Sequence, residues 1–209
     1  MRRAAARVAA ARRLAATTTA AGALALLAAA PVSAKVFHSQ EEALALAFPD
    51  ADRIESDTTL LSEAQVAAVE AAARSKLETR IAKFYVGWKD GERLGYAFID
   101  VHTVRTLPEA FLVVLTPEGR VRTLRVLAFH EPLDYMPTKH WYEQFDGKGL
   151  EDPLRLGGDV HGVVGATLSS RAVTQSVRRV LALHRYVVRG DRPDAPASDA
   201  AEGPGAGDD

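Results

Sequence analysis

Residues 165–170 combine small side chains with three hydroxyls at the expected start of a helix. The N–H groups of a first helical turn lack partners within the helix, and the helix dipole is positive there, so a phosphate group binds favourably. Serine and threonine are also the commonest helix N-caps, and local physics alone favours capping. Both interpretations apply to Gly165, Ala166, Thr167, Leu168, Ser169 and Ser170.

Other kinds of chemistry find little support in the sequence. The chain has no cysteine, which excludes disulfides, zinc-thiolate sites, iron–sulfur clusters and a thiol nucleophile. Its histidines form no His-x-x-x-His pair with a supporting carboxylate, so a metal site is not expected. Without a Gly-x-Ser-x-Gly elbow, a Walker loop or a dinucleotide fingerprint, the sequence indicates neither a hydrolase nor a nucleotide triphosphatase, and no catalytic residue is assigned.

Hydrophobic periodicity, capping boxes and turn residues predict the elements that position residues 165–170. Helices before and after an antiparallel sheet of hairpins indicate a single-domain α+β fold. The expected elements are helices over 41–48 and 62–77, two hairpins within 81–130 with turns at 89–91 and 116–119, a short helix over 138–145 and a last helix to about residue 184.

The two ends of the chain differ from this central part. Residues 1–34 contain five arginines, no acid, and an apolar run over 20–30 that is shorter than the roughly 20 residues of a membrane span. Small residues at Val32 and Ala34 predict cleavage of an export signal before Lys35. Residues 190–209 carry six acids and no large apolar side chain, so a disordered tail is expected after one domain over 35–189.

The charge balance indicates which partners to expect, and the export signal indicates the location. Without residues 1–34 the chain has 21 basic and 27 acidic side chains, a net charge of −6. Nucleic-acid binding requires clustered lysine and arginine, so it is not expected. The export signal predicts that the mature protein works in the periplasm or another compartment outside the cytoplasm.

Four features follow one another between residues 119 and 181. They are a hairpin strand over 119–129, the turn His130-Glu131-Pro132, an aromatic helix before Gly147-Lys148, and Gly-Ala-Thr with serines opening a valine-rich helix. In this order the stretch resembles the FMN-binding domain family, typified by covalently flavinylated subunits of sodium-pumping NADH:quinone oxidoreductase and Rnf-type electron-transport complexes. The export signal agrees, because the flavin of that family faces the outside of the membrane.

The resemblance implies a site for the FMN phosphate at the start of the last helix. In the family an exported flavin transferase takes FAD as donor and joins FMN through its phosphate to a threonine hydroxyl, here that of Thr167. Gly165 and Ala166 would leave room for the backbone to approach the phosphate. The expected donors to the phosphate oxygens are the N–H groups and hydroxyls of Leu168, Ser169 and Ser170.

The resemblance also implies contacts to the rest of the flavin. Glu131 matches an acidic residue that lies near the flavin, and we expect it to accept hydrogen bonds from the ring or the ribityl chain; a solvated turn acid is the alternative. Tyr135 and Met136 could flank the isoalloxazine ring, with hydrophobic loop packing as the alternative.

Two departures from the family pattern keep other functions open. Family members usually have serine or threonine before the glycine and aspartate six residues before the acceptor, where this chain has Val164 and His161. The leading hypothesis is an exported flavoprotein that relays electrons to membrane-associated redox partners, rather than a stand-alone enzyme. The alternatives are a flavin-free periplasmic adaptor and a flavin reductase with non-covalent FMN.

Processing of the export signal is directly testable. If Lys35 is the mature N-terminus, terminal sequencing of exported protein begins Lys35-Val36-Phe37. A product that sediments with membranes and retains residues 20–30 would instead establish an uncleaved anchor.

Overall fold

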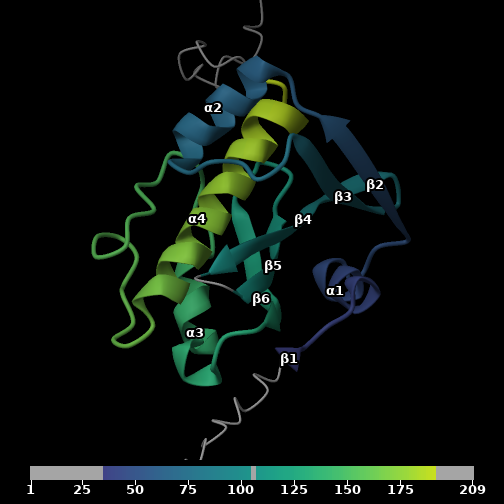
Figure 1. Ribbon diagram of the computed structural model, residues 1–209. Coiled ribbons are helices and arrows are strands. Elements are labelled where there is room, and N and C mark those ends of the chain that lie inside the picture. Colours follow the sequence, from purple (N-terminus) through teal and green to yellow (C-terminus); the bar gives the residue numbers. More distant parts are fainter. Residues whose placement is uncertain (1–34, 105–106, 192–209) are drawn as a thin grey trace, which may run out of the picture. The chain divides into compact units, whose positions relative to one another are not determined.

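The computed structural model describes residues 35–104 and 107–191 (Figure 1). They form a six-stranded antiparallel sheet flanked by helices, which confirms the predicted α+β class. The predicted export signal at 1–34 and all but Gly190 and Asp191 of the predicted tail lie outside the described residues.

The sheet is a chain of antiparallel neighbours in the order β1-β6-β5-β4-β3-β2. Both predicted hairpins are confirmed: β3 pairs with β4 across Asp90-Gly91, and β5 pairs with β6 across residues 116–120. The two edge strands were not predicted, because β1 is very short and β2 is almost entirely exposed and polar. The strands are β1 Lys35–Val36, β2 Arg53–Leu60, β3 Ile81–Lys89, β4 Glu92–Val104, β5 Leu107–Leu115 and β6 Val121–Phe129.

The helices begin where the capping boxes predict them. Ser39 and Ser62 each accept a hydrogen bond from the third helical residue, whose side chain accepts one in return. α2 ends earlier than predicted, because Arg74 adopts a left-handed conformation (φ 54°). The helices are α1 Gln40–Ala47, α2 Glu63–Ala73, α3 Lys139–Tyr142, which continues as a 3-10 turn over Glu143–Phe145, and α4 Thr167–Leu183, which continues as a π-turn over His184–Val188.

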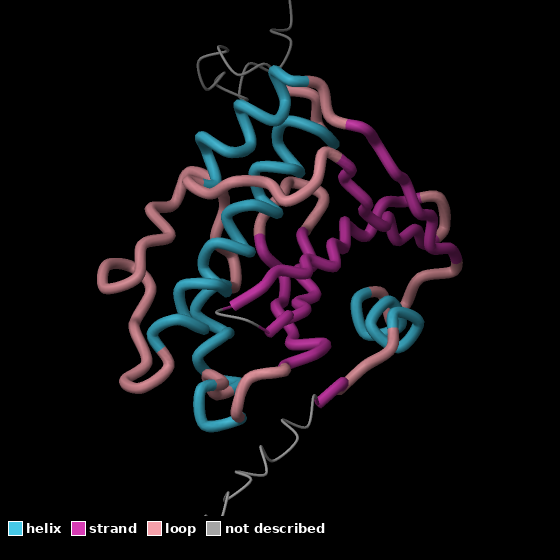
Figure 2. The backbone as a smooth tube through the Cα atoms, in the orientation of Figure 1, coloured by secondary structure: helices cyan, strands magenta, loops and turns pink. Residues whose placement is uncertain are grey.

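Burial on both faces of β5 divides the interior into layers. Phe111, Val113 and Leu115 belong to the apolar cluster that includes α4, whereas Leu112 and Val114 belong to the cluster that includes α1. α4 and α1 therefore cover opposite faces of the sheet, with α2 packed beside the end of α4 (Figure 1). Figure 2 shows the long loop that leads into α4 running beside this helix.

Membrane-spanning character is not found in this part of the chain. Across residues 35–104 and 107–191, no helix has both the length and the apolar composition needed to cross a bilayer.

A glycine pair on the β3–β4 hairpin tests how closely β4 approaches the neighbouring strand β5. Gly95 has φ +142°, and an added Cβ would collide with the carbonyl oxygen of Leu115 on β5. Gly91 has φ +83°, but an added Cβ would meet nothing within 4 Å. We expect Gly95→Ala to lower the free energy of unfolding by about 3 kcal/mol or more and Gly91→Ala by about 1–2 kcal/mol, as measured by urea unfolding. Equal losses would contradict the close approach of β4 and β5.

Candidate functional site

A cleft of about 190 Å³ lies at the start of α4. It is bordered by the end of β4, the segment after β6 and the first turn of the helix. Every lining residue except Val104 is one that the sequence analysis selected as a site residue. The lining residues are Val104, Glu131, Tyr135, Gly165, Ala166, Thr167, Leu168 and Ser169.

The cleft faces a helix end without a side-chain cap. Ala166 is the N-cap residue, and its methyl group cannot accept a hydrogen bond. The N–H of Ser170 makes a helical bond to the carbonyl of Ala166, at 2.9 Å. The N–H groups of Thr167, Leu168 and Ser169 precede that bond and have no carbonyl partner within the helix. The capping interpretation of these hydroxyls is therefore wrong, and the helix end can receive an anion.

The local backbone leaves space at this helix end. Gly165 has φ +85°, a conformation that glycine adopts without strain, and an added Cβ would meet nothing within 4 Å. Ala166 is buried beneath the cleft, whereas the side chain of Thr167 is exposed. The hydroxyl of Thr167 is thus accessible to a reagent that approaches from solvent.

Two of the predicted site residues do not line the cleft. Ser170 is fully buried, and its Oγ has no hydrogen-bond partner among the described residues. Met136 follows the 3-10 turn Leu133–Tyr135 and is half-buried outside the cleft lining. Tyr135, by contrast, lies in the cleft wall. The arrangement does not indicate a direct contact between a ligand in the cleft and Ser170 or Met136.

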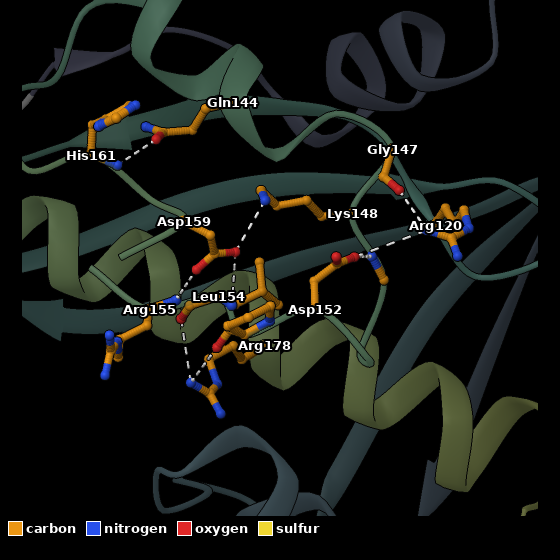
Figure 3. Close-up of polar contacts among 12 residues, drawn as sticks. Arg120, Gln144, Gly147, Lys148, Asp152, Leu154, Arg155, Asp159, His161 and Arg178 are labelled. Carbon is orange, nitrogen blue, oxygen red and sulfur yellow. Dashed lines mark hydrogen bonds and ion pairs between the residues drawn. The ribbon is translucent and has the colours of Figure 1, made fainter. Parts of the chain in front are cut away.

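The loop before α4 is held by the half-buried carboxylate of Asp159 (Figure 3). Oδ1 of Asp159 accepts a hydrogen bond from the N–H of Arg155 at 2.7 Å, and Oδ2 accepts from the N–H of Leu154 and from Nζ of Lys148. Burial alone would raise the pKa of Asp159, but these hydrogen bonds outweigh it and hold the pKa below its ordinary value. Arg178 of α4 then donates to the carbonyl of Leu154, which ties the loop to the helix.

The same loop is tied to α3 on the way to the cleft. The N–H of His161 donates to Oε1 of Gln144 at 2.7 Å (Figure 3), and Nε1 of Trp141 donates to the carbonyl of His161 at 2.6 Å. The side chains of His161 and Val164, the two departures from the family pattern, are exposed. Both can be substituted without opening the core.

Comparisons with known proteins give a structural likeness. The chain matches no family model and no curated protein. It resembles the crystal structure of NqrC from Shewanella oneidensis, with a TM-score of 0.40 and 18% sequence identity. The match covers 62% of this chain and 65% of that chain. A likeness at this level does not establish a shared function, and the chain spans less than two thirds of that protein.

A buried polar cluster lies on the α4 side of the sheet, and the sequence analysis did not predict it. Glu109 on β5 is fully buried, and neither carboxylate oxygen has a partner among the described residues. The same holds for Oε1 of Glu131 and the hydroxyl of Tyr142. The signal that could have found Glu109 is its place two residues before Phe111, which puts it on the core face of a strand.

Burial and charge set the protonation of this cluster. Burial, and then the nearby charge of Glu131, raise the pKa of Glu109 to about 7. Burial and the charge of Glu109 also raise the pKa of the Tyr142 hydroxyl, so Tyr142 stays protonated at neutral pH. Glu109 therefore gains or loses its proton near neutrality.

An ion pair between Asp100 and Arg179 lies beside this buried polar cluster. Asp100 accepts two hydrogen bonds from Arg179 of α4, at 2.7 and 2.8 Å, and one contact from Nδ1 of His102 at 3.0 Å. Burial disfavours the charged carboxylate, but these contacts outweigh burial and hold the pKa of Asp100 well below its usual range. The Asp100–Arg179 pair joins β4 to α4. Nε2 of His102, the other ring nitrogen, is buried and has no hydrogen-bond partner in the described part of the chain.

Protonation of Glu109 makes stability depend on pH. Because its native pKa of about 7 lies above the ordinary glutamate value of 4.5, the native state binds the proton more tightly, and stability falls as pH rises from about 4.5 to 7. We expect Glu109→Gln to match the wild type at pH 5 and to be more stable by about 2–3 kcal/mol at pH 8. Urea unfolding at both pH values measures the difference.

An exposed glutamate is the control for this experiment. Glu92→Gln removes a solvated carboxyl at the start of β4 and should not reproduce the gain at pH 8. If Glu109→Gln is less stable than the wild type at pH 8, Glu109 is not a strained buried carboxyl.

Proposed function

We propose that the cleft at the start of α4 binds FMN and that the chain is an exported electron-carrier flavoprotein. The observation that carries the proposal is the uncapped helix end, which opens onto a cleft lined by Thr167, Glu131 and Tyr135. An anionic phosphate meets unpaired N–H groups and the positive end of a 17-residue helix there. The sequence resemblance to the FMN-binding domain family supports the same ligand.

The phosphate end of FMN fits this helix start. The N–H groups of Thr167, Leu168 and Ser169 would donate to its oxygens, and the open space beside Gly165 lets the backbone approach them. The hydroxyl of the exposed Thr167 is the proposed acceptor. A flavin transferase would form the Thr167 Oγ1–phosphorus bond while the pyrophosphate bond of FAD breaks, with AMP as the leaving group and the hydroxyl proton released to solvent. In this position the side chain of Thr167 supplies the attachment, and the helix supplies the electrostatic stabilisation.

The size of the cleft supports a ring system that faces solvent. Pockets that enclose a drug-sized ligand are about 300–1,000 Å³, whereas this cleft is about 190 Å³. It suits the phosphate and ribityl parts, with Tyr135 and Glu131 in its wall and the ring at its mouth. Leu133, Val164 and Leu168 on the bordering segments are exposed apolar residues that can cover a ring there.

An exposed ring suits an electron carrier. FMN supplies reversible electron transfer when bound, and the protein contributes its position and electrostatic surroundings. A ring at the mouth of the cleft is accessible to membrane-associated redox partner proteins without a channel for a small substrate. Export to the periplasm would bring the carrier to the outer side of such a membrane complex.

Removing one hydroxyl tests covalent attachment. Thr167→Val keeps the branched shape, and Thr167 is exposed and is not the N-cap, so stability should change by less than about 0.5 kcal/mol. We expect the variant to lose all flavin fluorescence in denaturing gels after co-expression with a flavin transferase. Ser169→Ala is the matched control and should keep the fluorescent band, because it retains the acceptor hydroxyl and the backbone donors.

The outcomes separate three hypotheses. A band in Thr167→Val would mean that another residue is the acceptor. If the wild type shows no band with an active transferase but binds FMN reversibly, the attachment is non-covalent; if it binds no FMN, the proposed function is wrong. A band that appears only after Val164→Ser and His161→Asp would assign the failure to transferase recognition at these two exposed positions.

A further inference from the structure

The wall of the cleft is continuous with a buried polar cluster at one end of the sheet. Antiparallel pairing sets Glu109 on β5 opposite His102 on β4 and opposite Phe129 on β6. Glu131 lies two residues beyond Phe129 and also lines the cleft. Strand register and the short connection to Glu131 thus bring the two carboxyl groups to the same end of the sheet, and Glu131, unlike Glu109, lines the cleft.

Both carboxyl groups are desolvated. Glu109 has no exposed surface and Glu131 is 9% exposed, yet both oxygens of Glu109 and Oε1 of Glu131 lack partners among the described residues. Two ionised carboxylates at such a site would place two negative charges in a region of low dielectric with three oxygens that accept no hydrogen bond, which is strongly unfavourable. One proton relieves both problems, because a neutral carboxyl can donate a hydrogen bond to the other carboxylate.

Among residues 35–104 and 107–191, no cationic side chain forms an ion pair with Glu109 or Glu131. The titratable groups on the neighbouring described elements are His102 and Asp100 on β4, His130 beside Glu131, Tyr135 in the cleft wall, Tyr142 on α3 and Arg179 on α4. Arg179 and Asp100 are bound to each other, and Tyr142 stays protonated. Glu131 is the group whose charge acts on Glu109, and burial acts in the same direction.

We propose that Glu109 and Glu131 form a one-proton site in the wall of the cleft, and that this site takes up a proton when a phosphate group occupies the cleft. The carboxyl pair rests on the strand register, the burial of both groups and their unpartnered oxygens, together with the repulsion between them. Its response to phosphate rests on the proposed FMN occupancy.

Coulomb repulsion couples the proton to the phosphate. A phosphate monoester carries about −1.5 to −2 charges at pH 7, and Glu131 lines the same cleft as the helix end that would hold it. The added negative charge favours the neutral carboxyl form, so a proton moves from solvent to a carboxylate oxygen of the pair when the phosphate binds. The same proton returns to solvent when the phosphate leaves, and no other bond is made or broken.

The first test uses the full-length protein without flavin. Carboxyl carbons of ¹³C-labelled glutamate are followed by NMR between pH 4 and 9. We expect one glutamate to titrate near pH 7, to disappear from the spectra of Glu109→Gln, and to titrate at lower pH in Glu131→Gln because the neighbouring charge is gone. Glu92→Gln, an exposed control, should keep the titration near pH 7.

Two outcomes of this titration would overturn the pair. No glutamate titrating above pH 6 in the wild type would mean that the two carboxyl groups share no proton. An unchanged midpoint in Glu131→Gln would mean that burial alone acts on Glu109. Because wild type and Glu131→Gln suffice for these decisions, the test stands even if Glu109→Gln fails to fold.

The second test measures protons during binding. FMN is titrated into flavin-free protein at pH 7 by calorimetry in buffers with different ionisation enthalpies, with riboflavin as the ligand without phosphate. Because a carboxyl with a pKa of about 7 is half-protonated at pH 7, we expect net uptake of up to about half a proton with FMN, and a loss of that uptake in Glu109→Gln. FMN binding without proton uptake overturns the coupling, whereas a failure of FMN to bind contradicts the proposed function and leaves the carboxyl pair to be decided by the NMR titration.

Discussion

Residues 111–115 of β5 are all fully buried, and this strand has no solvent face. Alternate side chains of a strand point to opposite sides of the sheet, so burial of both sides requires two separate covering layers. α4 provides one layer with Val173, Val177 and Val180, and α1 provides the other with Ala43 and Ala47. The position of α4 over the sheet, and therefore of its N-terminus, depends on this central strand.

The same alternation brings polar groups into the interior where the apolar layer ends. Glu109 precedes Phe111 by two residues and faces the side of the sheet that α4 covers. A carboxyl group without partners at a core position is unfavourable, and natural sequences keep such local conflicts mainly at functional sites. Its neighbour Glu131 borders the cleft, which links the unfavourable burial to the candidate site.

Opposite electrostatic effects meet in the cleft. The first turn of α4 attracts an anion, whereas Glu131 repels one if both carboxyl groups are ionised. Protonation of the carboxyl pair near neutral pH would remove part of this repulsion, while the helix dipole stays constant. The affinity of the cleft for a phosphate group would therefore depend on pH through the carboxyl pair, and its orientation through the rigidly held start of α4.

The sequence by itself determined the elements whose signals are local. Capping boxes at Ser39 and Ser62, the turns of the two hairpins and the valine stripe of α4 predicted elements that the structure contains. These signals work because hydrogen bonds to nearby residues and burial of one helical face leave a periodic pattern. The α+β class followed from their order.

Only the tertiary structure decided which residues meet. The exposed edge strand β2 has no buried face and hence no hydrophobic alternation, so periodicity could not reveal it. The hydroxyls of residues 167–170 looked like caps, but the approach of the loop set Ala166 as the N-cap and left the helix end open. The effect of the Glu131 charge on Glu109 depends on strand register and on the turn after β6, and the sequence could not predict it because interactions between residues distant in sequence leave no local pattern.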